Sequence, residues 1–138
     1  MYSKLAQFNG DLVELAERAH ALSLKPTLPL LYQTTEPIQT EAIYKPLLKD
    51  TFPGQWQKCF LSIVWPNGSI MAHADIERKD RIRRHLVIKT NPDCWCMHDG
   101  NCQQLEAGGI YEMDEKLTHA AMNWGNDIRM HFVIDIKV

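Results

Sequence analysis

The feature that most restricts the possible folds is a change of pattern after Pro53. From there on, short runs rich in apolar and β-branched residues alternate with Gly, Asn, Asp and Pro, the residues that favour turns. The pattern predicts strands at Trp56–Val64, Ser69–Asp75, Arg83–Lys89, Cys94–His98, Gly109–Met113, Thr118–Asn123 and Ile128–Lys137. So many short strands with regular turns predict a mainly β fold, a sandwich or small barrel whose inward side chains can line a cavity.

The part of the chain before this run predicts fewer elements. Asp11–Leu22 has an apolar stripe at helical spacing and an acidic capping residue at its start, so we expect one short helix there. Leu28–Thr35 is an expected short strand, and Thr35–Pro53 an expected long connection with one helical turn near Glu41–Tyr44. With 138 residues, we expect a single domain in which residues 1–55 support a catalytic core at residues 56–138.

Composition excludes several classes of protein. The apolar fraction of 45%, the charged fraction of 23% and the net charge of −2 are typical of a soluble globular protein. No run approaches the roughly 20 apolar residues of a membrane helix, and no signal peptide is visible. Basic residues cluster only at Arg78–Arg84, so we expect no nucleic-acid partner. We expect a cytoplasmic protein in which the four cysteines remain thiols.

The first candidate for chemistry is a His-x-Asp sequence at His73 and Asp75. The preceding Trp65–Gly68 contains Asn-Gly, a strong hairpin signal, so Lys58–Val64 and Ser69–Asp75 are expected to pair. Residues two apart on a strand point to the same face, which would place the imidazole and the carboxylate side by side. An isolated His-x-Asp is more often a polar strand end than a metal site.

His119 strengthens the metal hypothesis because it begins a later apolar run. Together with His73 and Asp75 it would supply two histidines and one carboxylate. That donor set on one face of a cation, with open positions opposite, is typical of non-haem Fe(II) oxygenases.

Arg129 lies inside the last predicted strand and needs a partner there, because a buried charge is costly when unpaired. Alternation places Met130, Phe132 and Ile134 on one face and Arg129, His131 and Val133 on the other. If the second face lines a cavity, a dicarboxylate cosubstrate is one candidate partner, since a guanidinium binds a carboxylate through two hydrogen bonds. An internal salt bridge is the alternative. His131 could touch the same ligand or be a hydrogen-bonded core histidine.

Three further polar residues could belong to this anion site. Ser62 could donate its hydroxyl to the anion held by Arg129. Arg83 and His85 share a face of their strand and could contact a second carboxylate, although a solvated rim explains them equally well.

These residues, taken in order, resemble a known family. The pattern resembles the aspartyl/asparaginyl β-hydroxylases, Fe(II)- and 2-oxoglutarate-dependent dioxygenases built on a double-stranded β-helix, a cupin-like jelly roll. The resemblance spans residues 60–135 and rests on Phe60–Ile63, Pro66, Gly68, His73, Arg83, His85, Leu86, Gly109, Met113, Asp114, His119, Asn123, Arg129 and Asp135. Members typified by the animal enzyme have no carboxylate ligand at the position of Asp75.

The resemblance implies a role for each candidate residue. His73 and His119 match the two iron-binding histidines, to which Asp75 adds a third ligand. Arg129 and Ser62 match the residues that hold the distal carboxylate of 2-oxoglutarate. Arg83 and His85 match an Arg-x-His element of the family that lies near the metal-proximal end of the cosubstrate.

The implied activity is hydroxylation of a C–H bond with use of dioxygen and release of succinate and CO2. The expected substrate is an amino acid, a related small acid or a peptidyl side chain, and the oligomeric state stays open. A cupin-like module that binds a metal or an organic anion without turnover is the alternative, and a metal-dependent isomerase is a third option. Zinc at Cys94, Cys96, His98 and Cys102 is a less favoured interpretation than a strand with buried thiols and a turn at Asp99–Asn101.

Overall fold

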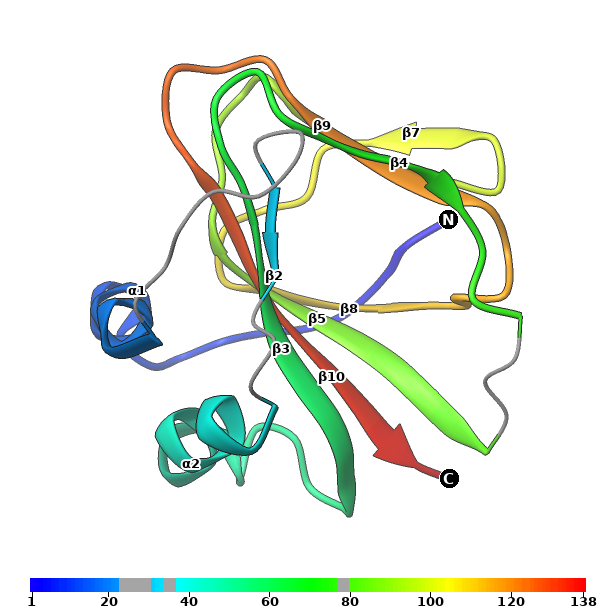
Figure 1. Cartoon of the computed structure of the whole chain (residues 1–138). Coiled ribbons are helices and arrows are strands. Elements are labelled where there is room, and N and C mark those ends of the chain that lie inside the picture. Colours follow the sequence, from blue (N-terminus) through cyan, green and yellow to red (C-terminus); the bar gives the residue numbers. More distant parts are fainter. Residues whose placement is uncertain (23–30, 34–36, 77–79) are drawn as a thin grey trace.

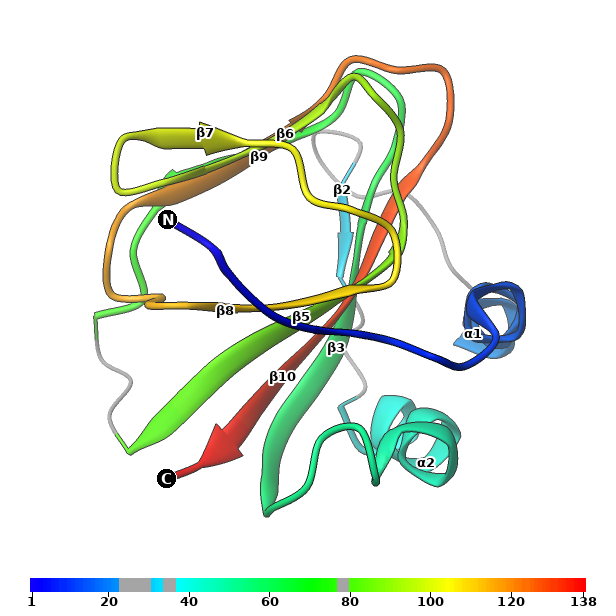
Figure 2. The same ribbon diagram turned by 180° about the vertical axis from the view of Figure 1, so that it is seen from behind.

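The computed structural model of the chain describes residues 1–22, 31–33, 37–76 and 80–138. Within these residues, ten strands form two antiparallel sheets that face each other across an opening (Figures 1 and 2). The larger sheet has the order β1 (Ser3–Gln7), β8 (Gly109–Met113), β5 (Arg81–Lys89), β10 (Arg129–Lys137), β3 (Trp56–Val64) and β2 (Leu31–Gln33). The smaller has the order β4 (Ser69–His73), β9 (His119–Asn123), β6 (Cys94–His98) and β7 (Asn101–Gln103). This confirms the predicted mainly β, jelly-roll architecture.

The helices lie on the side of the six-stranded sheet that faces away from the smaller sheet (Figures 1 and 2). They are α1 (Leu12–Arg18), its 3₁₀ continuation η1 (Ala19–Leu22) and α2 (Pro37–Leu48). Asp11 caps α1 as predicted, because its carboxylate accepts the backbone N–H groups of Val13 and Glu14 at 2.9 and 3.1 Å.

The principal apolar core lies between these helices and the sheet. Phe132 of β10 is fully buried there, with its ring centroid 5.3 to 5.9 Å from those of Tyr44, Phe52 and Trp56. Rings at this separation add favourable edge and offset contacts to the burial of their surface. The core therefore forms on the outer face of the large sheet, and the space between the two sheets is left for other side chains.

The prediction of a long connection at Thr35–Pro53 was wrong, because α2 occupies most of it. Proline disfavours the interior of a helix, so Pro46 predicts that no helix continues through this position. In the structure Pro46 nevertheless lies inside α2. Tertiary packing outweighs that preference: Tyr44 and Leu48 are fully buried, and the Tyr44 hydroxyl donates to the Leu15 carbonyl oxygen at 2.7 Å. The predicted strand at Leu28–Thr35 contains β2, and its residues 28–30, 34 and 35 lie outside the described residues.

All seven strands predicted after Pro53 are present with small shifts of their ends, but the turn at Trp65–Gly68 does not make a hairpin. It joins β3 in one sheet to β4 in the other. Pro66 and Asn67 form a type II turn, in which Gly68 N–H donates to Trp65 O at 2.8 Å and Asn67 has a φ of 64°. The turn therefore carries the chain from sheet to sheet.

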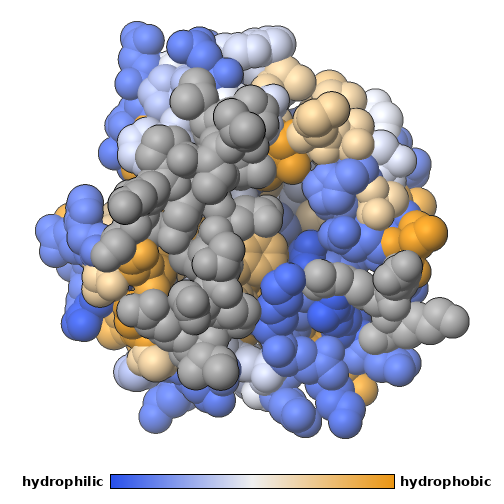
Figure 3. All heavy atoms as spheres, viewed as in Figure 1, coloured by the Kyte–Doolittle hydropathy of each residue, from blue (hydrophilic) through white to orange (hydrophobic). Residues whose placement is uncertain are grey.

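The two faces of the large sheet differ in chemistry. The outer face is apolar, whereas the face toward the smaller sheet carries buried polar groups, among them Ser62, Arg83, His85, Arg129 and His131. At the surface, Figure 3 shows hydrophilic residues gathered at the lower right of this view, where β5 begins and β10 ends. None of the described helices has the length and apolarity needed to span a bilayer.

Candidate active site

The predicted metal ligands converge. β4 pairs with β9 in a register that sets His73 opposite His119, and their ring centroids lie 4.3 Å apart. Asp75 lies in the loop after β4 rather than inside the predicted strand, and its Oδ2 is 3.9 Å from the Nε2 of each histidine. The donor atoms lie within 4.8 Å of one another, and no other such ligand group occurs in the described part of the chain.

Both imidazoles have the tautomer that a metal requires at Nε2. His73 Nδ1 donates to Met71 O, and His119 Nδ1 donates to Leu117 O, each at 2.8 Å. A proton fixed on Nδ1 leaves the Nε2 lone pair free, and the carbonyl also orients the ring. Burial lowers the pKa of His119, an effect only partly opposed by its hydrogen bond to Leu117, so the ring is neutral near neutral pH.

These donors fit a divalent first-row cation. The residue types are the two histidines and one carboxylate that suit non-haem iron. Metal–ligand bonds of about 2.1 Å bring donors to roughly 3–4 Å from one another, so the three side chains would close on an ion by small rotations.

Asp75 is held in place by Arg83 and by the loop before β9. Its backbone N–H donates to Glu115 O at 2.8 Å, and Arg83 Nη1 donates to its Oδ2 at 3.2 Å. Arg83 also makes 2.8 Å ion pairs with Glu115 and Asp135, and Arg81 contacts the same two carboxylates at 3.3 Å. Although burial opposes the charge, the hydrogen bond and charge of Asp135, with the charges of Glu115 and Asp75, raise the pKa of Arg83.

Arg129 provides a buried positive charge without a carboxylate. Its Nη1 donates to Ser62 Oγ at 3.0 Å and lies 3.4 Å from Ser62 O. Within the described residues, no Asp or Glu lies within salt-bridge distance of its guanidinium, so the internal salt bridge considered as an alternative is absent from this part of the chain. A buried guanidinium that has no carboxylate nearby favours the binding of an anion, because an unpaired buried charge is costly.

His85 and His131 form a pair next to that charge. Their Nδ1 atoms lie 3.2 Å apart, so one ring donates and the other accepts. Burial first, and then the charge of Arg129, lower the pKa of both rings well below the usual value. His85 Nε2 is buried and has no hydrogen-bond partner in the described residues.

One cavity of about 40 Å³ is lined by candidate residues of both kinds, His73 and His119 for a metal and Ser62, His85 and Arg129 for an anion. The lining also includes Tyr2 and Arg83. The predicted strands therefore bring the two candidate histidine ligands of one sheet and the candidate anion-binding residues of the other to the same space.

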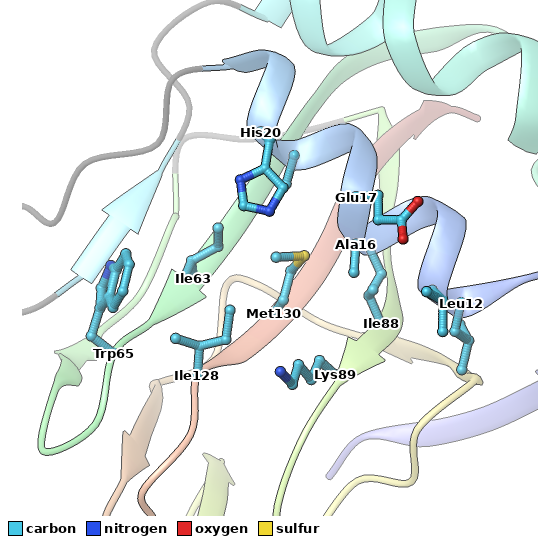
Figure 4. A pocket seen from close by; sticks show the side chains of 12 residues that line it. Leu12, Ala16, Glu17, His20, Ile63, Trp65, Ile88, Lys89, Ile128 and Met130 are labelled. Carbon is cyan, nitrogen blue, oxygen red and sulfur yellow. The ribbon is translucent and has the colours of Figure 1, made fainter.

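A larger pocket, of about 650 Å³, lies elsewhere. It opens between α1 and the outer face of the six-stranded sheet, where Figure 4 shows Ile63, Ile88, Met130 and other aliphatic side chains along its wall. Glu17 and His20 also line it, but they belong to no converging ligand group among the described residues. Its larger size alone therefore does not make it a candidate active site.

The cysteine segment forms a hairpin. Cys94 and Cys96 are buried, Cys102 is exposed, and all four cysteines are free thiols. Asp99 and Gly100, with φ values of 50° and 80°, make the two-residue turn between β6 and β7. The expected strand with buried thiols is present at β6, but the turn is shorter than expected because Asn101 already begins β7. No converging zinc ligands are found in this segment.

Sequence reasoning missed Tyr2, Glu115 and the pairing role of Asp135. Asp135 could have been found, because it continues the alternation of Arg129 and His131 and lies opposite Arg83 in the sheet. Glu115 and Tyr2 come from a loop and from the segment before β1, where no periodic signal marks them.

Comparison with solved structures places the fold. A 2OG-Fe(II) oxygenase family oxidoreductase from Burkholderia pseudomallei matches with a TM-score of 0.65 and 14% identity, covering 97% of this chain and 82% of that one. The protein TT1209 from Thermus thermophilus matches with a TM-score of 0.56 and 9% identity, over 86% and 93% of the two chains. The Cupin_2 domain of an XRE family transcriptional regulator from Enterobacter cloacae matches with a TM-score of 0.54 and 13% identity, covering 79% of this chain and 98% of that one. These likenesses show a cupin-like fold.

The family itself is shown by sequence. The sequence model described as Aspartyl/Asparaginyl beta-hydroxylase matches residues 33–138, which include every predicted site residue. The resemblance inferred from the ordered motif is thereby confirmed over most of the chain. The chain belongs to the aspartyl/asparaginyl β-hydroxylase family.

Proposed function

We propose that the chain is an Fe(II)- and 2-oxoglutarate-dependent hydroxylase. One observation carries the proposal: the two histidines of a two-histidine, one-carboxylate donor set line the same cavity as a buried guanidinium that has no carboxylate partner among the described residues. A 2-oxo dicarboxylate is the ligand that such a site suits, because one end can chelate a metal while the other meets a cation. Family membership supports the same reaction class.

The residues have separate tasks in this proposal. His73, Asp75 and His119 would hold the metal with two imidazole nitrogens and one carboxylate oxygen. Bound Fe(II) would supply dioxygen activation coupled to oxidative decarboxylation of 2-oxoglutarate to succinate and CO2. Arg129 and Ser62 bind the far carboxylate, and this second attachment fixes the orientation of the cosubstrate.

His85, His131 and Arg83 complete the surroundings of the cosubstrate. His85 lines the cavity, and its Nε2 has no hydrogen-bond partner among the described residues. Its Nδ1 is hydrogen-bonded to His131 Nδ1, which fixes the orientation of the ring. Arg83 binds Asp75 directly, so it acts on the metal through that ligand as well as lining the cavity. The bond that is hydroxylated belongs to an amino acid, a related small acid or a peptidyl side chain.

Anaerobic titration with Fe(II) and then 2-oxoglutarate tests the proposal, read out as the charge-transfer absorption of the chelate. We expect no signal from His119→Ala. Arg129→Gln should keep metal binding but weaken 2-oxoglutarate binding about 10- to 100-fold, the value of charge-assisted hydrogen bonds. Ser62→Ala should lower the affinity for 2-oxoglutarate a few-fold. Arg18 is exposed on α1, so Arg18→Gln should bind the metal and 2-oxoglutarate as wild type does.

Admission of oxygen then separates an enzyme from a binding module. Succinate formed in amounts that exceed the protein supports the hydroxylase. A normal chelate spectrum without succinate, tested over a panel of amino acids and peptides, would favour the cupin-like module that binds without turnover. Wild-type binding in both His119→Ala and Arg129→Gln would refute the assigned site.

A further inference from the structure

A side chain from the segment before β1 forms one wall of the candidate active site. Tyr2 is only 4% exposed, although all five residues of the following strand are exposed. Its backbone is held by Gln103, which accepts from Tyr2 N–H at 2.6 Å and donates to Tyr2 O at 3.2 Å. In both views the start of the chain lies between the two sheets (Figures 1 and 2).

The Tyr2 ring packs against histidines of the interior. It meets His85 edge-on with centroids 5.5 Å apart, and His98 at 5.6 Å. It lines the same cavity as Arg129 and His119, so it borders the space that a ligand reaching from one to the other would occupy. Burial raises the pKa of its phenol, which therefore remains a neutral hydrogen-bond donor.

The size of the cavity makes this wall important. A volume of about 40 Å³ is far below the roughly 300–1,000 Å³ of typical small-molecule sites. A five-carbon dicarboxylate needs more space, so part of the lining must yield to it. Arg129 and Ser62 belong to strands inside the large sheet, and His85 is fixed by His131. Tyr2 precedes β1, which is an edge strand with a register shift.

We propose that Tyr2 is a specificity-determining residue, the wall that limits the length of the oxo acid bound between Arg129 and the metal ligands. The inference rests on the proposed function. It goes beyond the family, because the family match begins at residue 33 and this wall comes from residues that precede it.

The test compares the binding of oxaloacetate, 2-oxoglutarate and 2-oxoadipate, which differ by one methylene each. Affinities are measured anaerobically by calorimetry on protein loaded with Mn(II). Tyr2→Ala should raise the affinity for 2-oxoadipate relative to 2-oxoglutarate about tenfold or more over wild type, because one methylene in a fitted pocket is worth about that much. Tyr2→Phe should keep the wild-type length preference, since its ring fills the same space.

Matched variants separate this role from general packing. Leu105 and Tyr111 belong to the same apolar cluster as Tyr2 but do not line the cavity. Leu105→Ala and Tyr111→Phe should lower stability and leave the affinity ratio unchanged. Gln103→Leu removes the hold on the Tyr2 backbone and should shift the ratio in the direction of Tyr2→Ala, which provides a second test if Tyr2→Ala does not fold.

The outcomes are distinguishable. A ratio that is unchanged in folded Tyr2→Ala, or in Gln103→Leu, overturns the inference and leaves the proposed function intact. An equal shift in Leu105→Ala would also overturn it, because the effect would then be one of packing. If metal-loaded wild type binds none of the three acids, the proposed function fails and the inference fails with it.

Discussion

At the scale of single residues, the structure gives Arg83 a larger role than contact with a ligand. Its guanidinium pairs with Asp75, Glu115 and Asp135, and so connects a metal ligand to two carboxylates deeper in the molecule. Asp75 lies beyond the end of β4, although the sequence predicted it inside that strand. Strand geometry therefore does not fix the orientation of its side chain. The position of this candidate metal ligand therefore depends on the ion pair with Arg83 and on the backbone hydrogen bond to Glu115.

A substitution of Arg83 tests that dependence. Arg83→Lys keeps the charge but cannot hold three carboxylates with a planar fork, so we expect metal affinity to fall about 10- to 100-fold, as for other groups that orient ligands. Arg83→Met should also lower the free energy of unfolding by about 3–5 kcal/mol, because it breaks a buried ion pair. Calorimetry with Mn(II) and chemical denaturation measure the two effects.

Arg84 supplies the control for this experiment. It is the next residue on β5 and points to the other face, and within the described part of the chain its one ion-pair contact is with Glu112 at 3.8 Å. Arg84→Met should change the free energy of unfolding by less than about 1 kcal/mol and leave metal binding as it is. Unaltered metal affinity in Arg83→Lys would show that Asp75 does not need this support.

At the scale of elements, strands were predictable where one face is apolar and the other is not. β10 shows this well: the predicted faces of Met130, Phe132 and Arg129 agree with the structure, because alternation follows directly from strand geometry. β1 was missed because its five residues are all exposed and show no alternation. α2 was missed because Pro46 contradicts a helix that tertiary packing stabilises.

The turn at Trp65–Gly68 shows a further limit at this scale. Its residues predict a turn, but whether the flanking strands pair depends on where the next sheet lies, and local sequence does not contain that information. The turn is nevertheless specific, because Asn67 adopts a left-handed backbone at φ 64°.

Substitution at Asn67 tests this geometry. Asn67→Ala should lower the free energy of unfolding by about 1 kcal/mol, the cost of a left-handed conformation for a residue with a β-carbon. Asn67→Gly should be close to neutral, since glycine adopts this conformation freely. Urea denaturation of the two variants checks the difference, and equal stability of the two would contradict the type II assignment.

At the scale of the whole molecule, the main apolar core and the polar groups of the candidate site lie on opposite faces of the large sheet. The helices cover the apolar core on the outer face, and the space between the sheets holds histidines, arginines and carboxylates beside a smaller apolar cluster. The convergence of His73, Asp75 and His119 was predictable from a known donor pattern. The small cavity and its Tyr2 wall were not, because they depend on how separate segments pack.

The buried histidines make stability depend on pH. His85 and His131 have lowered pKa values in the folded chain, whereas they titrate near 6.5 when unfolded. The unfolded state therefore gains protons first as the pH falls. Stability should be constant above about pH 7.5 and should fall below about pH 6.5 by up to about 1.4 kcal/mol per pH unit for each histidine.

Denaturation between pH 8 and pH 5 measures this slope. His131→Gln should reduce the slope of stability against pH by the contribution of one histidine, up to about 1.4 kcal/mol per pH unit. His20→Gln, at an exposed position in η1, should leave it unchanged. A slope in His131→Gln equal to that of wild type would contradict a lowered pKa of this ring in the folded protein.

The most direct test of the account is a crystal structure obtained anaerobically with Mn(II) and 2-oxoglutarate, using anomalous scattering to locate the metal. The account predicts a metal peak bonded to Nε2 of His73, Nε2 of His119 and a carboxylate oxygen of Asp75, with the far carboxylate of the anion paired to Arg129. A metal peak at any other place, or an anion bound away from Arg129, would contradict it.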